Sequence, residues 1–209
     1  KATVCRVKAE LERRVFEPLR SNSYFWEHGN NNWSAVCAGG VGIALMYTDK
    51  KAAEEFMPRL IGAADSCLAS YTSDGTCLEG FTYWNYGFGY FVYFADMLYR
   101  FTDGRIDMFD NAHVQKTASY PQRSLMRGNS VVSFADAGQN DRAQGDLIYY
   151  LHRRYPETAA LLPENRIKFP ELNCRWCSYL RYFAWVDPEV KGENEPEGTY
   201  LLPDAGQYI

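Results

Sequence analysis

Apolar residues recur at three- and four-residue spacing over most of the first 125 positions, which is typical of helices with one buried face. The stripes cover residues 4–19, 36–47, 53–71 and 88–99, and turn-forming residues such as Ser73-Asp74-Gly75 separate them. A weaker helix is expected over 105–125, ending near Pro121. Successive antiparallel helix pairs are the units of helical bundles and α/α toroids, so the pattern predicts an all-α architecture.

The pattern changes after residue 126. We expect a short strand over 130–134, a loop over 136–141, a helix over 146–154, a short turn over 156–162 and a further helix over 172–186. An acidic stretch with Pro and Gly follows at 187–198, and residues 200–209 have the pattern of a β-hairpin. The expected division is therefore a helical domain over 1–186, then a linker and the start of a β-domain over 187–209.

Residues 79–90 hold three glycines among tyrosines, a tryptophan, one carboxylate and one amide. Glycine weakens a helix, and Tyr and Trp bury well only when their polar atoms find partners. Flat rings and phenols on a glycine-loosened backbone suit a sugar site. The alternative interpretation is an aromatic core segment that precedes a buried helix.

A second unusual stretch, residues 24–34, contains Asn30-Asn31-Asn32 followed by Trp33. Asparagine favours turns and helix caps, so Asn32 or Ser34 is expected to cap the helix that follows. The alternative is functional: an amide donor at a helix N-terminus, where backbone N–H groups already favour an anion.

Composition narrows the class of protein. The 209-residue chain is 46% hydrophobic, 23% charged and 16% aromatic, with a net charge of −4 that argues against a nucleic-acid partner. No apolar run approaches the roughly 18 residues of a membrane span. Because the first residue is Lys rather than Met, a signal peptide or an upstream domain could have been removed. The sequence therefore does not decide between a secreted, a periplasmic and a cytoplasmic location. The six cysteines predict no disulfide framework, and the CxxC spacing of Cys174 and Cys177 lacks the second ligand pair of a zinc site.

Several short motifs occur in a fixed order: Asn31-Asn32-Trp33, Cys37-Ala38-Gly39-Gly40, Glu79-Gly80 and Tyr83-Trp84-Asn85-Tyr86-Gly87. Over residues 20–140 the chain resembles the heparinase II/III-like polysaccharide lyases, a family that includes alginate and oligoalginate lyases. The closing residues 202–206 resemble the opening of that family's β-sandwich. The resemblance implies an incomplete α/α toroid of antiparallel helix hairpins, truncated at the start of a β-sandwich domain. The chain departs from the family in one respect: none of its histidines matches the catalytic histidine that the family takes from its β-domain.

The resemblance implies β-elimination on a glycan that contains uronic acid. Asn32, or alternatively Asn31, would neutralise the sugar carboxylate, and Asn32 lies 54 positions before Tyr86. Tyr86 would act as acid, and as base if nearby cations stabilise its phenolate, with Tyr83 as the fallback. Trp33 and Trp84 are candidates for stacking on sugar rings, and Glu79 is a candidate for bonding a substrate hydroxyl or for orienting its loop. Arg123 and Arg127 are candidates for contact with the polymer's charge, although a solvated surface role explains each of them more simply.

Two other classes of function remain open. A glycoside hydrolase would need two carboxylates across the bond, and Glu79 with Asp136 is one candidate pair. A helical toroid could also bind glycan, or support another domain, without catalysis. No cofactor is expected in this part of the chain, although a metal ion could bind in the β-domain that the resemblance implies. The expected partner is an acidic polysaccharide or oligosaccharide. The sequence does not predict the oligomeric state.

Overall fold

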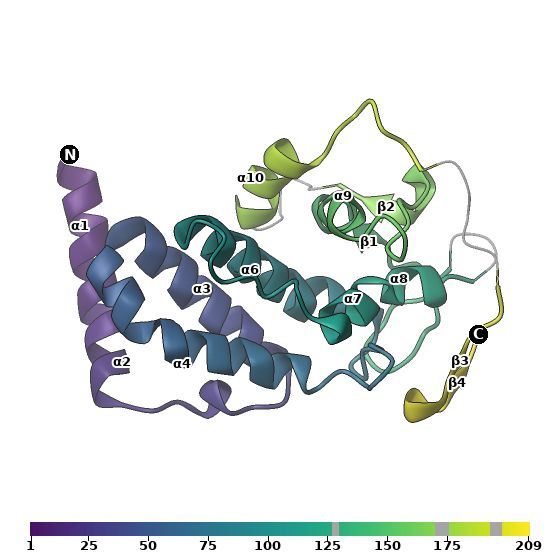
Figure 1. Ribbon diagram of the computed structural model, residues 1–209, viewed down its shortest axis with the longest axis horizontal. Coiled ribbons are helices and arrows are strands. Elements are labelled where there is room, and N and C mark those ends of the chain that lie inside the picture. The colour runs from purple at the N-terminus through teal and green to yellow at the C-terminus, as the bar shows by residue number, and fades with distance from the viewer. Residues whose placement is uncertain (127–129, 170–175, 193–197) are drawn as a thin grey trace. The chain divides into compact units, whose positions relative to one another are not determined.

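The computed structural model describes residues 1–126, 130–169, 176–192 and 198–209, and it is mostly helical with two short two-stranded sheets (Figure 1). The predicted helical character is confirmed. The chain divides into two compact units. Unit 1 contains Lys1–Ala69 and Tyr90–Asp107, and unit 2 contains Ser70–Gly89 and Met108–Ile209. The domain boundary expected at residue 187 stays a prediction.

Unit 1 consists of helices joined by short connections. The first stripe forms one continuous helical run, from α1 (Ala2–Leu11) through the π-helical η1 (Glu12–Phe16) to α2 (Glu17–Ser21). A short 3-10 turn, η2 (Phe25–Glu27), precedes the two long helices α3 (Asn32–Thr48) and α4 (Lys50–Leu68). Most of α6 (Gly89–Phe101) completes the unit. The predicted helices over 4–19, 36–47 and 88–99 are therefore confirmed, and so is the one over 53–71 except that it ends at Leu68, since Tyr71 makes an isolated bridge with Cys77.

Helices α3 and α4 form a hairpin with a one-residue connection (Figure 1). Asp49 is the connecting residue. Its carboxylate accepts the Ala52 N–H at 3.0 Å and so caps the N-terminus of α4, which allows the second helix to begin at once. A side chain at Gly42 would overlap the ring of Phe94, so glycine lets α6 approach α3 closely. Buried Leu45, Leu60 and Phe94 belong to the core that these three helices share.

Unit 2 begins with α5 (Phe81–Tyr83) and the π-helical η3 (Trp84–Phe88). It continues with α7 (Ala112–Ala118), α8 (Tyr120–Arg123), β1 (Ala143–Gln144), α9 (Gly145–Arg154), η4 (Glu164–Arg166), β2 (Ile167–Lys168), α10 (Trp176–Trp185), β3 (Leu201–Leu202), η5 (Pro203–Ala205) and β4 (Gln207–Tyr208). The weaker helix expected over 105–125 is thus two short helices. The helix expected over 146–154 corresponds to α9. The helix expected over 172–186 corresponds to α10 from residue 176 on, and residues 172–175 lie outside the described residues.

The two sheets of unit 2 are small. β1 pairs in parallel with β2 through Ala143 and Ile167, while β3 and β4 form the antiparallel hairpin that the sequence predicted. The strand predicted over 130–134 is wrong: Val131 makes only an isolated bridge with Leu125. The Val131 N–H donates to the Gln139 carbonyl at 2.9 Å, so a loop, rather than a second strand, satisfies this backbone.

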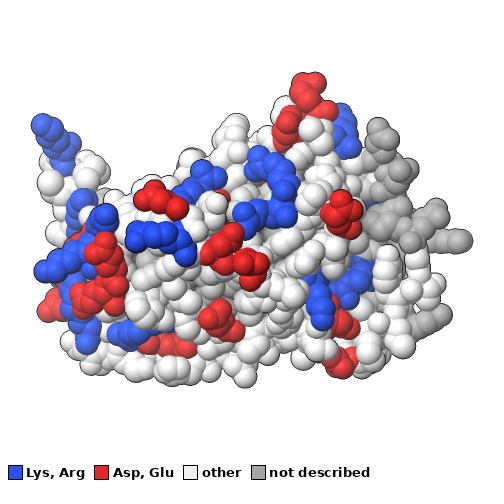
Figure 2. Space-filling view, in the orientation of Figure 1, with Lys and Arg blue, Asp and Glu red and all other residues white. Residues whose placement is uncertain are grey.

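Charged side chains are mixed in sign at the end of unit 1 that carries α1 and α2 (Figure 2). Glu10 lies 2.8 Å from Arg13 and 2.7 Å from Arg14, and Arg20 pairs with Glu12. Such exposed pairs are worth little stability, typically below about 1 kcal/mol. Within the described residues, no helix combines the length and apolarity needed to cross a bilayer.

Candidate functional site

The N-terminus of α3 is capped by Asn31, whose side-chain oxygen accepts the Trp33 N–H at 3.0 Å. The cap is therefore neither Asn32 nor Ser34, as the sequence predicted, because Asn32 is already the first residue of the helix. The Ser34 hydroxyl instead donates to the Gly29 carbonyl. Since the oxygen of Asn31 is engaged in the cap, its Nδ2 group is the part that can donate to an anion.

Arg59 on α4 holds the loop that leads to this cap. Its Nε and Nη2 atoms donate to the two carboxylate oxygens of Glu27 at 2.9 and 2.7 Å, and Glu27 also accepts the Tyr24 N–H at 2.8 Å. The same guanidinium donates to the Leu19 and Asn22 carbonyls. Burial alone would raise the pKa of Glu27, but these donors outweigh it and hold the pKa below its usual value. The Asn-rich loop is thus fixed to the helical core.

Beside the cap, two aromatic side chains are open to solvent. Trp33 is 55% exposed and Phe25 is 70% exposed, with their ring centroids 6.1 Å apart at 58°. Asn32, by contrast, is buried at the first position of α3 and has a polar or electrostatic partner. The sequence pattern predicted a contact role for Trp33 but not for Phe25. The position of Phe25 just before a polar turn could have indicated that its ring is exposed.

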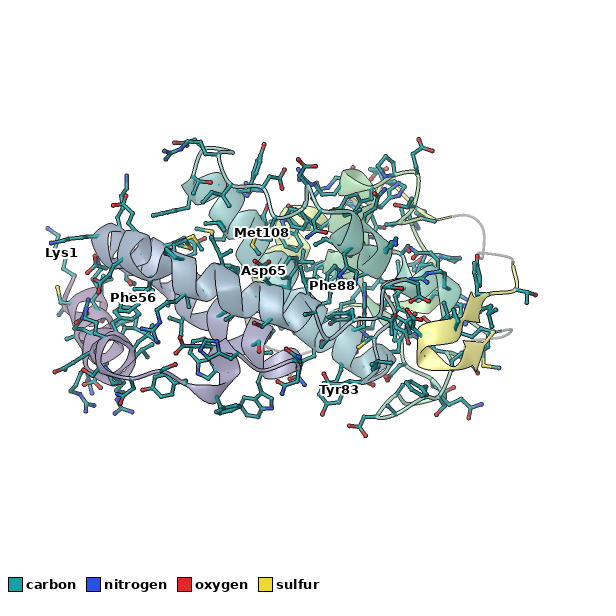
Figure 3. All side chains as sticks on the ribbon, turned by 60° about the horizontal axis from the view of Figure 1, so that its bottom comes forward. Lys1, Phe56, Asp65, Tyr83, Phe88 and Met108 are labelled. Atoms are coloured by element: carbon teal, nitrogen blue, oxygen red, sulfur yellow. The ribbon has the colours of Figure 1, made fainter. Side chains whose placement is uncertain are left out.

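In unit 2 the aromatic stretch has two faces. Phe81, Trp84 and Phe88 are fully buried, with ring centroids 5.6–6.2 Å apart along the series, and the Trp84 indole donates to the Thr117 carbonyl at 2.8 Å. Trp84 is therefore a core residue in this structure and presents no face for stacking on a sugar. Figure 3 labels Tyr83 and Phe88, of which Tyr83 is half-buried and Phe88 is fully buried.

Tyr83, Tyr86 and Glu79 remain half-buried at the other face of this stretch. Both tyrosines lie near the change from α5 to π-helical η3, and π-helical turns often occur at functional sites. Tyr86 and Glu79 each have a partner within the protein.

Residues 136–144 are anchored to the same stretch by two polar side chains. Asn85 donates to the Arg142 carbonyl and accepts the Gln144 N–H, both at 2.9 Å. The Thr82 hydroxyl contacts the Asp141 carboxylate and the Asp136 carbonyl. Neither Asn85 nor Thr82 was predicted to have this role, because a single polar residue in an aromatic run carries no spacing signal.

Arg123 is not a solvated surface cation. It is half-buried, and its Nη2 donates to the Asp74 carbonyl at 2.8 Å and the Lys116 carbonyl at 3.1 Å. Burial lowers the pKa of Arg123, and Asp74 partly offsets this. Arg127 lies outside the described residues, as does Cys174.

The proposed acid–base tyrosine and the proposed amide belong to different units: Asn32 is in unit 1 and Tyr86 in unit 2. That they address one groove stays a prediction. Among the described residues, no three His, Cys, Asp or Glu side chains gather as metal ligands. No protein-family model matches the chain, and no curated protein is significantly similar to it.

Proposed function

We propose that this chain is the helical, toroid-type part of a polysaccharide lyase that cleaves an acidic glycan by β-elimination. The observation that carries the proposal is the N-terminus of α3, where the capping Asn31 lies beside the exposed Trp33 and its neighbour Phe25. Exposed aromatic faces suit pyranose rings, and amide donors at a helix N-terminus suit a uronate carboxylate.

The chemistry divides among these groups. The C5 proton of a uronic acid is weakly acidic until its carboxylate is neutralised, which is the role proposed for Asn32, with Asn31 as the alternative. If cations stabilise the Tyr86 phenolate, it removes the C5 proton and then passes that proton to the leaving glycosidic oxygen; otherwise Tyr86 protonates the oxygen and a second group must take the C5 proton. Tyr83 is the alternative acid. Trp33 stacks on a sugar ring and Glu79 bonds a hydroxyl, while buried Trp84 has no part in substrate contact.

An absorbance assay tests the proposal. The protein is incubated with heparan sulfate, hyaluronan and alginate, and the ultraviolet absorbance of the unsaturated product is followed. We expect Tyr86→Phe to lower turnover at least about 100-fold, the usual scale of a lost general acid, while substrate affinity changes little. Wild-type rates in that variant would remove Tyr86 from the mechanism, and new reducing ends without ultraviolet absorbance would indicate a hydrolase.

Binding of glycan without catalysis is the second candidate. It is favoured by the exposure of Phe25 and Trp33 in unit 1, which needs no partner from unit 2. Retained binding with no cleavage of any of the three polymers would support it. Trp33→Ala is then expected to abolish binding, whereas Tyr47→Ala, which removes another exposed aromatic residue of α3, is the matched control.

A further inference from the structure

Unit 2 contains a pocket of about 250 Å³ lined by residues that the proposed mechanism does not use. Three aromatic side chains contribute to its walls: Tyr149 on α9, Tyr182 on α10 and Phe169 after β2. Glu164 and Lys191 also line the pocket and form a largely exposed ion pair, with Nζ and Oε2 3.8 Å apart. The volume corresponds to about eight water molecules, which is the scale of one small ring compound rather than a polymer.

The segment that closes this pocket is fixed at two points. The Tyr149 hydroxyl donates to the Val190 carbonyl at 2.7 Å. Gly192 pairs with Pro163 in a parallel bridge, and a side chain at Gly192 would overlap the backbone of residues 161–162. Burial raises the pKa of Tyr149, with Glu164 adding to the effect, so its hydroxyl stays protonated and keeps this bond. The pocket is therefore built by side-chain and backbone contacts rather than being a gap between loops.

The lining combines two kinds of surface. Phe169 and Tyr182 meet edge to face, with ring centroids 5.4 Å apart at 75°, beside aliphatic side chains such as Ile167. Lys191 offers N–H donors, Glu164 offers acceptors, and the phenol of Tyr182 can do either. A purely apolar ligand would leave these polar atoms unused, and a single ion would leave the aromatic walls unused.

We propose that this pocket binds one pyranose ring of a saccharide. The C–H face of a pyranose would pack on the aromatic wall, and its ring of hydroxyls would exchange hydrogen bonds with Lys191, Glu164 and Tyr182. Because Lys191 and Glu164 balance each other in charge, a neutral hexose fits as well as a uronic acid. The site is independent of the proposed lyase chemistry, since it needs neither Asn32 nor Tyr86.

Saturation-transfer difference NMR on the 209-residue chain tests the proposal, with methyl glucoside, glucuronate and cyclohexanol as probes. We expect transfer to the ring protons of both sugars and a Kd of about 1 mM, as the small number of ligand atoms allows. Cyclohexanol has a similar ring but a single hydroxyl, so it should bind at least about tenfold more weakly. No transfer to the ring protons of either sugar at 10-fold the expected Kd, about 10 mM, would overturn the proposal. Equal or tighter binding of cyclohexanol would also overturn it.

Variants locate the binding. Tyr182→Ala should weaken sugar binding about tenfold or more, and Tyr182→Phe should weaken it less, because the ring remains. Leu180→Ala is the matched control on α10, since Leu180 is exposed and does not line the pocket. Circular dichroism confirms that each variant is folded. Sugar binding that survives Tyr182→Ala unchanged, or that is lost equally in Leu180→Ala, would place the sugar elsewhere and overturn the assignment. The absorbance assay for β-elimination reads out the lyase separately, so either idea can fail alone.

Discussion

At the scale of single residues, Arg59 and Glu27 matter most for the candidate site in unit 1. Their bidentate pair is 32 positions apart along the chain, and it joins the loop before α3 to the middle of α4. The Glu27 side chain is almost fully buried, whereas that of Arg59 is 34% exposed. Removing Arg59 would leave the buried Glu27 carboxylate without its cation. This lowers the free energy of unfolding by more than the net amount that the ion pair itself contributes.

The pair predicts a pH dependence of stability. The folded-state pKa of Glu27 lies below its usual 4.5, so the folded protein favours the carboxylate. Its contribution is complete above about pH 4.5 and is lost as the pH falls through the lower folded-state pKa. Urea unfolding between pH 7 and 3 should therefore show a fall in stability that is smaller in Glu27→Gln than in the wild type.

Comparison with Glu27→Gln is needed because the pKa of Asp74 is also lowered, mainly by hydroxyl and backbone donors from Thr72 and Thr76 that outweigh its burial. Asp74 contributes a fall of the same sign that persists in both proteins. At pH 7, Arg59→Met is expected to cost about 2 kcal/mol, below the 3–5 typical of a fully buried pair because Arg59 is partly exposed. Parallel pH curves for wild type and Glu27→Gln would contradict the assignment.

At the scale of elements, apolar spacing predicted the long helices because each has a continuous buried face. Leu60, Ala63, Ala64 and Cys67 of α4 show this directly: all are buried at three- and four-residue spacing, even though Pro58 lies inside the helix. The strand expected at 130–134 from Val131, Val132 and Phe134 is wrong, because this segment has no partner strand among the described residues. Periodicity describes one segment, whereas a sheet depends on a second segment that the local pattern does not contain.

The aromatic stretch shows a different limit. Glycines argued against a helix, yet α5, η3 and α6 run without a break from Phe81 to Phe101 and contain Gly87 and Gly89, while Gly80 lies just before the run. Burial of Phe81, Trp84 and Phe88 outweighs the cost of glycine, about 1 kcal/mol each. Residue types indicated which side chains have polar tips, but only packing decided that Trp84 is a core residue while Tyr83 and Tyr86 are half-buried.

Gly80 gives a prediction for this element. Its φ of +88° is a conformation that L side chains rarely adopt, and a Cβ there would overlap the Phe134 carbonyl. Gly80→Ala should therefore cost about 2 kcal/mol or more in thermal or urea unfolding. Gly62→Ala in α4, where a Cβ meets nothing within 4 Å, is the matched control and should stabilise by about 0.5–1 kcal/mol. Equal effects of the two changes would show that the backbone at Gly80 is not constrained.

At the scale of the whole molecule, neither unit is a continuous piece of chain. The chain passes between them after Ala69, Gly89 and Asp107, and the second passage lies at the start of α6. A helix loses its hydrogen bonds cooperatively, so unfolding of unit 1 is expected to unravel α6 back toward η3. Both units should therefore unfold in a single transition, although each has its own core.

Hydrogen exchange tests this coupling. Arg59→Met changes only unit 1, and its expected cost of about 2 kcal/mol corresponds to about 30-fold lower protection of amides that exchange by global unfolding. We expect the slowest amides of α4 in unit 1 and of α9 in unit 2 to lose the same factor. Leu180→Ala, an exposed change in unit 2, should leave both unaffected. Wild-type protection in α9 beside reduced protection in α4 would mean that the units unfold separately. Asn32 of α3 and Tyr86 of η3 would then belong to units that are stable independently. The continuous helix through α6 would not be enough to hold the two side chains at one substrate groove.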